Sequence, residues 1–163
     1  MPEARRLLVV YHSRSGSTAS LLAEVRTGIG EAAAAIDEAG ETAPIDRVLA
    51  AQDADAADVQ WADALILATP ANFGYMSGLV KDFFERAYPV CVDTTAGLPF
   101  ALVVKGDTDA DGAVASVERI ATGLRWKEIL PPLVVVGQLT DAHRAAAREL
   151  GATVAAGLAA GLF

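Results

Sequence analysis

Residues 7–18 read LLVVYHSRSGST, and this stretch decides the fold. The apolar run at 7–11 predicts a short buried strand, and apolar residues at three- and four-residue steps from Thr18 onward predict a helix. The turn between them is rich in hydroxyl groups and contains Gly16, where the backbone can bend sharply. Such a turn directs backbone N–H groups and the positive end of a helix dipole at one point, which suits a phosphate. We therefore expect a phosphate site here; the alternative is a serine-rich turn in which Ser17 is only the helix N-cap.

The spacing within this loop excludes three common phosphate-binding motifs. A nucleotide-hydrolysing P-loop needs a Gly-Lys pair, which the sequence lacks, and a dinucleotide fingerprint needs three glycines where only Gly16 is present. A phosphatase loop needs a cysteine after the first strand, whereas the single cysteine is Cys91. The remaining pattern, Ser13-x-Ser15-Gly16-x-Thr18, resembles the Thr-x-Thr-Gly-x-Thr loop of flavodoxins, which wraps the phosphate of FMN.

Length and composition favour one domain over residues 1–163. The hydrophobic fraction of 53% allows a substantial core, and the net charge of −8 leaves no basic surface for nucleic acid. No apolar run approaches the ~20 residues of a membrane span, and the first residues contain no signal-peptide core. One cysteine forms no internal disulfide. We therefore expect a cytoplasmic protein that binds neither nucleic acid nor a membrane.

Short apolar runs alternate with helical patterns along the whole chain. The expected strands are residues 7–11, 44–49, 64–68, 100–104 and 133–136. The expected helices are residues 18–36, 76–87, 114–124 and 141–158, the last with Asp141 as N-cap, and a short helix is expected at 55–61. This alternation predicts an α/β fold, a doubly wound five-stranded parallel sheet in the order 2-1-3-4-5 with helices on both faces. Ligands of such sheets bind beyond the carboxyl ends of strands 1 and 3.

A second informative loop follows the third strand, where residues 69–78 read TPANFGYMSG. Phe73 and Tyr75 supply an aromatic wall for a flat ring, and Gly74 permits close approach of the backbone. The alternative is that both aromatic residues only cap the core.

The two loops together carry a family resemblance. The pattern Thr69-Pro-x-x-Phe73-Gly74-x-Met76-Ser77-Gly78-x-x-Lys81-x-Phe83 resembles the second flavin loop of the flavodoxin-like NAD(P)H:quinone reductases and FMN reductases. The Trp-repressor-binding-protein type is the most similar group. Asn72 and Tyr75 stand where those proteins usually carry Arg and Asn, and the chain lacks their long insertions and the histidine near the ring.

This resemblance implies FMN as cofactor and NAD(P)H as co-substrate, with a quinone, a flavin or a similar small molecule as electron acceptor. Because the flavin carries the chemistry, no catalytic protein residue and no metal are expected. A homodimer that covers the flavin edge is compatible with the resemblance. The implied cofactor-binding residues are Ser13, Arg14, Ser15, Gly16, Ser17, Thr18, Pro70, Ala71, Asn72, Phe73, Gly74, Tyr75, Gly106 and Asp107.

The loop after the fourth strand permits two interpretations of its charges. Lys105 either neutralises a reduced flavin or is a solvated residue at a strand end. The acidic residues at 107, 109, 111 and 118 match the spacing of an EF-hand calcium loop. An EF-hand needs a helix before its loop, however, and residues 100–104 predict a strand. We therefore favour an acidic loop and helix N-cap over a calcium site.

Two alternatives to a reductase remain open from the sequence. One is a flavodoxin in the strict sense, a one-electron carrier whose acidic surface docks on a basic reductase. The other is an interaction module that keeps the fold without a cofactor. A receiver domain shares the topology, but it needs acidic residues where this chain has His12-Ser13 and Thr69-Pro70.

Overall fold

The computed structural model describes residues 2–163, which form an α/β sandwich around one largely parallel sheet. The strands are β1 (Arg6–Tyr11), β2 (Ile45–Ala50), β3 (Ala64–Asn72), β4 (Tyr75–Met76), β5 (Pro99–Gly106), β6 (Lys127–Glu128) and β7 (Leu133–Val136). The helices are α1 (Ser17–Glu38), α2 (Ala56–Trp61), α3 (Gly78–Cys91), α4 (Asp111–Gly123) and α5 (Asp141–Ala159).

The strand order confirms the predicted doubly wound topology. The sheet runs β2-β1-β3-β5, and both β6 and β7 pair with β5 in parallel as two pieces of the fifth strand. Pro131 and Pro132 lie between the two pieces, where the missing N–H groups prevent a continuous ladder. The sequence did not predict the short β4, which pairs antiparallel with the end of β3.

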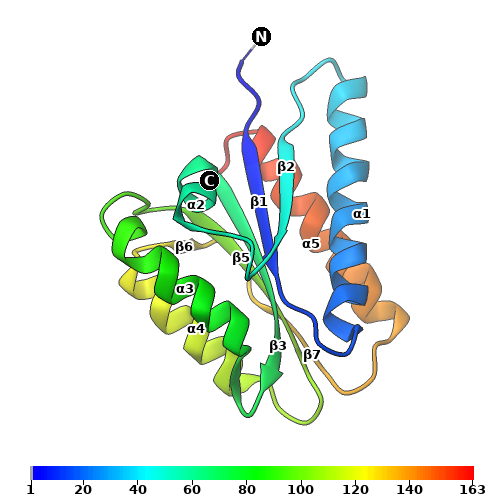
Figure 1. Cartoon of the computed structure of the whole chain (residues 1–163). Helices are drawn as coiled ribbons and strands as arrows, with labels where there is room; N and C mark the ends of the chain where they lie inside the picture. The colour runs from blue at the N-terminus through cyan, green and yellow to red at the C-terminus, as the bar shows by residue number, and fades with distance from the viewer. Residues whose placement is uncertain (1) are drawn as a thin grey trace.

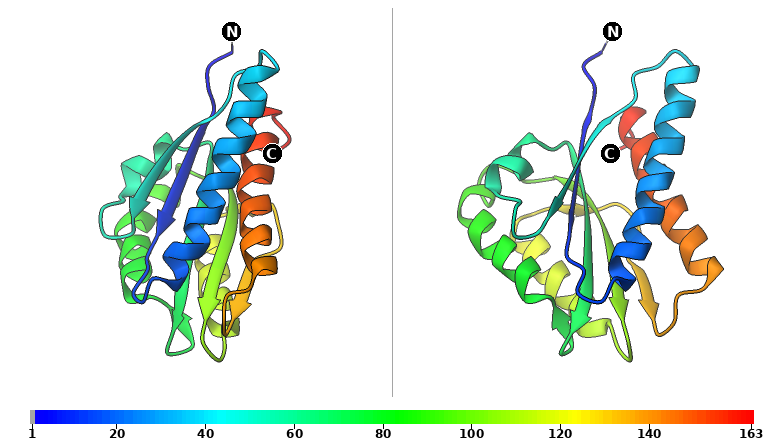
Figure 2. Two further views of the ribbon diagram at one scale, coloured as in Figure 1. Left: turned by 90° about the vertical axis from the view of Figure 1, so that its right-hand side faces the viewer. Right: turned by 45° about the vertical axis from the view of Figure 1, so that its right-hand side comes forward.

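Helices cover both faces of the sheet, and each face has its own core. Helices α1 and α5 lie on one face, and α2, α3 and α4 lie on the other (Figures 1 and 2). Within β1, Leu7 and Val9 pack toward α1 and α5, whereas Leu8 and Val10 pack toward α3 and α4. A parallel strand buried on both sides reads as a continuous apolar run, which is the pattern at 7–11.

Several helix ends differ from those predicted. Thr140, not Asp141, is the N-cap of α5, and its hydroxyl accepts a hydrogen bond of 3.3 Å from the N–H of His143. Helix α3 begins after Ser77, so Met76 lies in β4, and the helix continues through Cys91. Apolar spacing marks the buried face of a helix, whereas its first residue depends on side-chain caps to the free N–H groups. Within residues 2–163, no helix is long and apolar enough to cross a membrane.

The two helices on the α1/α5 face cross at glycines, where their backbones are in direct contact. A Cβ atom on Gly28 would overlap the carbonyl group of Arg148, and one on Gly151 would overlap the carbonyl group of Val25. By contrast, Gly30 lies on α1 with nothing within 4 Å of the same position. The crossing therefore depends on Gly28 and Gly151 but not on Gly30.

Replacing these glycines with alanine is expected to change stability in opposite directions. Gly28→Ala should lower the free energy of unfolding by about 1–3 kcal/mol, because the helices must separate to admit the methyl group. Gly30→Ala should raise it by about 0.5–1 kcal/mol, since alanine favours a helix over glycine. Urea denaturation of both variants measures the difference, and equal effects would contradict the crossing described here.

Candidate functional site

The carboxyl ends of β1, β3 and β5 meet at one edge of the sheet, drawn at the lower end of Figure 1. In the parallel register Tyr11 lies opposite Ala68, and Pro70 lies opposite Lys105. The N–H of His12 extends this ladder by donating a 3.0 Å hydrogen bond to the carbonyl of Ala68. The loops that follow these three strands are therefore gathered at one edge, as the topology requires.

The first of these loops leads into α1, whose N-cap residue has no side chain to cap the helix. That residue is Gly16, not Ser17; it has a φ of 92°, and no side chain caps it. The first turn contains no acidic residue, so nothing there neutralises the positive end of this 22-residue helix. Ser13 folds back over the turn, and its Oγ accepts a 3.1 Å hydrogen bond from the N–H of Ala19. The arrangement favours an anion.

The remaining side chains of this loop differ in exposure. Arg14 and Ser15 are exposed, Ser13 and Ser17 are half-buried, and Thr18 is buried in the first turn of α1. His12 is half-buried, and among residues 2–163 its Nδ1 has no hydrogen-bond partner. Burial, together with the nearby Arg14 cation, lowers the pKa of His12. Its imidazole is therefore neutral at pH 7, and the positive charge of the loop comes from Arg14 and the helix dipole.

The second loop is a tight hairpin with an aromatic residue at its tip. Ala71 pairs with Met76 and Asn72 pairs with Tyr75, so Phe73 and Gly74 form a two-residue turn. Both have positive φ, 51° and 67°, which is the conformation of a type I′ turn. Asn or Gly usually occupies the first position because a bulky side chain is strained there. Phe73 is nevertheless fully exposed, so no burial offsets the strain.

Contacts from α4 hold this hairpin in place. The N–H of Met76 donates a 3.1 Å hydrogen bond to Oγ of Ser116, a buried side chain. The Cα of Gly112 lies directly against the carbonyl of Gly74, where a Cβ would overlap it. Sequence reasoning did not find these two roles, because Ser116 lies in no recognisable motif and Gly112 was noted only within the EF-hand-like spacing; both residues act across the fold.

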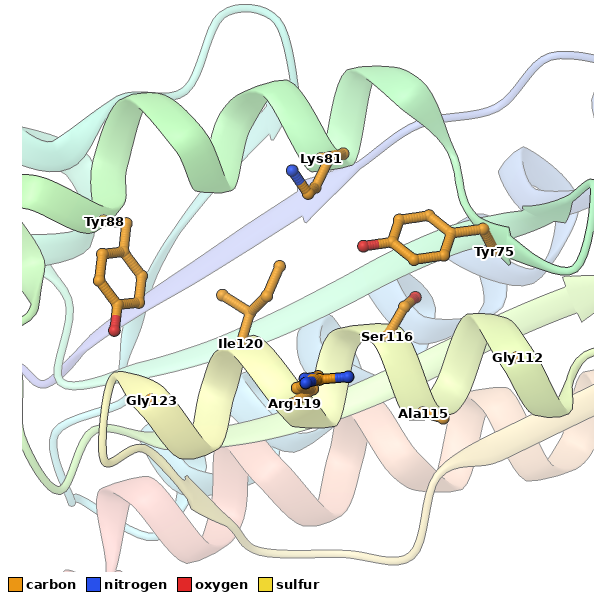
Figure 3. A pocket seen from close by; sticks show the side chains of 9 residues that line it. All are labelled: Tyr75, Lys81, Tyr88, Gly112, Ala115, Ser116, Arg119, Ile120 and Gly123. Carbon is orange, nitrogen blue, oxygen red and sulfur yellow. The ribbon is translucent and has the colours of Figure 1, made fainter.

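Tyr75 leaves the hairpin toward a groove between α3 and α4. Figure 3 shows its ring pointing into this groove, with Ser116 beside it and Lys81 on the opposite helix. The groove has a volume of about 620 Å³ and continues past Arg119 to Tyr88. Tyr75 lines this groove and Phe73 does not.

A cleft of about 670 Å³ lies between the amino ends of α1 and α5. Of the residues predicted to bind cofactor, Ser15, Gly16, Ser17 and Asp107 line it, and none of residues 70–75 does. Lys105 also lines it and is not solvated as one interpretation expected, because only 6% of its side chain is exposed. Its Nζ donates to the carbonyl of Gly106 at 2.9 Å and to Oδ1 of Asp107 at 3.3 Å.

The third loop closes against α4 and does not form an EF-hand. Oδ1 of Asp109 accepts a 2.9 Å hydrogen bond from the N–H of Asp111, the first residue of α4. Strand β5 precedes the loop, and Glu118 lies within α4. Residues 2–163 contain no group of three or more His, Cys, Asp or Glu side chains that could hold a metal ion. Gly106 is buried where a Cβ would meet the carbonyl of Asp109.

Comparisons with known proteins agree with this geometry. The family model for NADPH-dependent FMN reductases matches residues 12–141, a segment that contains all three loops. A flavodoxin from the domain Archaea is 16% identical, with 94% of this chain and 98% of that chain covered and a TM-score of 0.77. A flavodoxin, WrbA-like protein from Agrobacterium tumefaciens is 18% identical, with coverages of 97% and 99% and a TM-score of 0.74. No curated protein matches the sequence.

The residues at the sheet edge fit the two ends of FMN. The phosphate end needs a helix amino terminus with hydroxyl donors around it. The loop at 13–18 contains both, and Ser13 already accepts the N–H of Ala19. The ring needs an apolar neighbour and close backbone groups, and Phe73 is exposed next to Gly74 at the tip of the hairpin. The strain at Phe73 also suggests a functional role for its side chain.

Replacing Phe73 is expected to separate stability from ligand affinity. Phe73→Asn should raise the free energy of unfolding of the FMN-free protein by about 1 kcal/mol, because asparagine tolerates the left-handed backbone. The same change should weaken FMN binding about two- to tenfold through loss of an aromatic contact. Chemical denaturation and fluorescence titration measure the two effects.

Val90→Asn is the matched control, because Val90 is an exposed apolar residue near the end of α3. Its FMN affinity should equal that of the unmodified protein. A Phe73→Asn variant that binds FMN with unchanged affinity would show that Phe73 does not contact the flavin.

Proposed function

Because the chain belongs to the NADPH-dependent FMN reductase family, we propose that it accepts hydride from NAD(P)H and passes electrons to a quinone, a flavin or a similar small acceptor. Its place in the family makes it an FMN-binding flavoprotein oxidoreductase of the flavodoxin-like fold. One observation carries the proposal: the amino end of α1, whose N-cap residue Gly16 has no side chain, lies at the same sheet edge as the loops after β3 and β5. We further propose that residues 1–163 act as one FMN-binding domain in the cytoplasm, a reducing compartment that suits the lone buried Cys91.

In this proposal, each of the three loops holds a different part of FMN. Residues 13–18 hold the phosphate through backbone N–H groups, hydroxyls and the helix dipole. The β3–β4 hairpin, residues 70–75, and the backbone of Gly106 and Asp107 hold the ring. The cofactor supplies the chemistry when bound, accepting a hydride and returning electrons, and the protein binds and orients it.

The hairpin gives the nicotinamide and the acceptor a route to the ring. Phe73 is fully exposed at the tip of the hairpin, so this apolar edge is open to a planar molecule. A rigid support keeps that edge in position, since Ser116 and Gly112 fix the turn from α4. An open ring edge favours reaction with small molecules.

A second candidate is a one-electron carrier of the flavodoxin type. Its support is the near-complete structural overlap with solved flavodoxins. The match to the flavodoxin of Megasphaera elsdenii covers 90% of this chain and 98% of that chain, with 16% identity and a TM-score of 0.68. The net charge of −8 would favour docking on a basic reductase. Turnover with NAD(P)H distinguishes the two candidates.

FMN binding is expected to depend on the hydroxyls of the first loop. Saturating FMN, at 100 times its dissociation constant, should stabilise the protein by about 2.7 kcal/mol.

Ser15→Ala should lower the affinity for FMN about tenfold, through loss of a hydrogen bond to a charged phosphate, and should leave the affinity for riboflavin unchanged. Thr27→Ala is the control, because Thr27 lies further along α1 and its hydroxyl donates to the carbonyl of Ala23 within that helix. Equal losses for FMN and riboflavin would place the phosphate elsewhere.

Steady-state kinetics are expected to show enzymatic turnover. With a soluble quinone as acceptor, the FMN-loaded protein should oxidise NADPH or NADH at about 1–1,000 turnovers per second, the common range for enzymes. Free FMN at the same concentration is the control. A rate no higher than that control, with FMN still bound to the protein, would favour the electron carrier.

A further inference from the structure

The groove between α3 and α4 is separate from the cleft at the first loop, and no residue lines both. Of the residues predicted to bind cofactor, only Tyr75 lines the groove, and its ring points into it (Figure 3). The volume of about 620 Å³ is within the range of small-molecule sites. We propose that this groove binds an amphiphilic monocarboxylate, a small molecule with one carboxylate group and an elongated apolar body. The inference does not rest on the proposed function.

Glycines near the two ends of α4 allow the opposite elements to close the groove. The Cα of Gly112 lies against the carbonyl of Gly74 in the β3–β4 hairpin, and a Cβ on Gly123 would lie 2.9 Å from the hydroxyl of Tyr88. Residues 112–123 span about 16 Å of helix. The groove is therefore bounded by the hairpin at one end and by Tyr88 at the other. It suits a molecule shorter than this span better than a polypeptide that would run through it.

The floor between these two ends is apolar. Ile120 lies at its centre in Figure 3 and is half-buried, and Ala115 also lines it. The hydroxyl of Ser116 accepts the N–H of Met76 at 3.1 Å and donates its single proton to the carbonyl of Ala113 at 2.8 Å. Because that proton is already used, a polar ligand body would gain no donor from the floor. The body of the ligand is therefore apolar.

Two cations stand on opposite walls of the groove, Lys81 from α3 and Arg119 from α4, and none of the described residues that line it is acidic. Lys81 pairs with Glu85 at 3.1 Å, but 66% of the Glu85 side chain is exposed, so solvent screens this pair. Arg119 is exposed and, within residues 2–163, forms no ion pair. In a chain with a net charge of −8, this groove is a local exception.

The charge balance selects the head group of the ligand. Lys81 and Arg119 contribute two positive charges, and Glu85, paired with Lys81, offsets one of them. A single carboxylate neutralises the charge that remains, whereas a phosphate ester or a polyanion would leave an excess of negative charge. A guanidinium group can hold a carboxylate through two parallel N–H donors. The ligand therefore places its carboxylate at Arg119 and its apolar body over Ile120.

The test is a calorimetric titration of the protein with three eight-carbon probes that differ only in head group: octanoate, octan-1-ol and octylammonium. Octanoate should bind saturably and about tenfold more tightly than octylammonium, because the groove is cationic. Acetate, which has the carboxylate without the apolar body, should show no measurable binding. Backbone amide shifts at Gly112 and Gly123, recorded in the same titration, should locate octanoate in the groove.

Two variants separate the roles of the charge and of the floor. Arg119→Gln should lower the affinity for octanoate about tenfold and leave the affinity for octan-1-ol unchanged. Ala115→Phe, which fills the groove from an exposed position, should weaken the binding of both probes. Arg26→Gln is the matched control, because Arg26 is exposed on α1, which covers the other face of the sheet. It should bind octanoate as the unmodified protein does.

The inference is overturned if octan-1-ol binds as tightly as octanoate, or if Arg119→Gln leaves the affinity for octanoate unchanged. The titrations are run with and without added FMN, and octanoate should bind in both, so a failure of FMN binding is seen separately. Competition between octanoate and FMN would instead place the acid in the flavin site and contradict the inference. Sedimentation tests the remaining occupant: a dimer that binds no octanoate, and that Arg119→Gln dissociates, would assign the groove to a second copy of the chain and not to a small acid.

Discussion

The parallel hydrogen-bonded register of β1, β3 and β5 is the constraint on which the site depends. Because these three neighbours run in the same direction, their carboxyl ends and the loops that follow them meet at one edge. The same register brings the amino end of α1 to that edge, since the helix begins six residues after β1 ends. A shift of one residue in the register would turn every side chain of β5, including Lys105, to the opposite face of the sheet.

The β3–β4 hairpin shows how packing supports a conformation that its sequence disfavours. Phe73 in a left-handed backbone costs about 1 kcal/mol, and its exposed ring gains nothing from burial. The turn persists because Ser116 accepts the N–H of Met76, and because Gly112 lets α4 approach the carbonyl of Gly74. Strain that is supported in this way commonly marks a functional position.

Local electrostatics at the sheet edge run against the charge of the whole molecule. The chain carries a net charge of −8, yet the edge combines the amino end of α1, Arg14, a half-buried Arg144 and a buried Lys105 that is paired with Asp107. His12 adds no charge at neutral pH, since burial and Arg14 lower its pKa. Anionic groups are therefore attracted to the first loop by the helix dipole and Arg14, while Asp107, Asp109 and Asp111 of the third loop repel them.

The sequence by itself determined the order of strands and helices, the strand order of the sheet and the two loops expected to bind the cofactor. Apolar periodicity and the turn residues at 13–18 and 69–78 act locally, so they can be read along the chain. Helix ends were less predictable, because Gly16 became the N-cap of α1 through its left-handed backbone, whereas Ser77 and Thr140 became caps through side-chain hydrogen bonds to backbone N–H groups. Only the tertiary structure decided that Lys105 is buried and lines one cleft with Arg144, that Tyr75 enters the α3–α4 groove and that α4 supports the hairpin. These features arise from contacts between residues far apart in the chain, and no local pattern encodes which distant side chain will lie opposite.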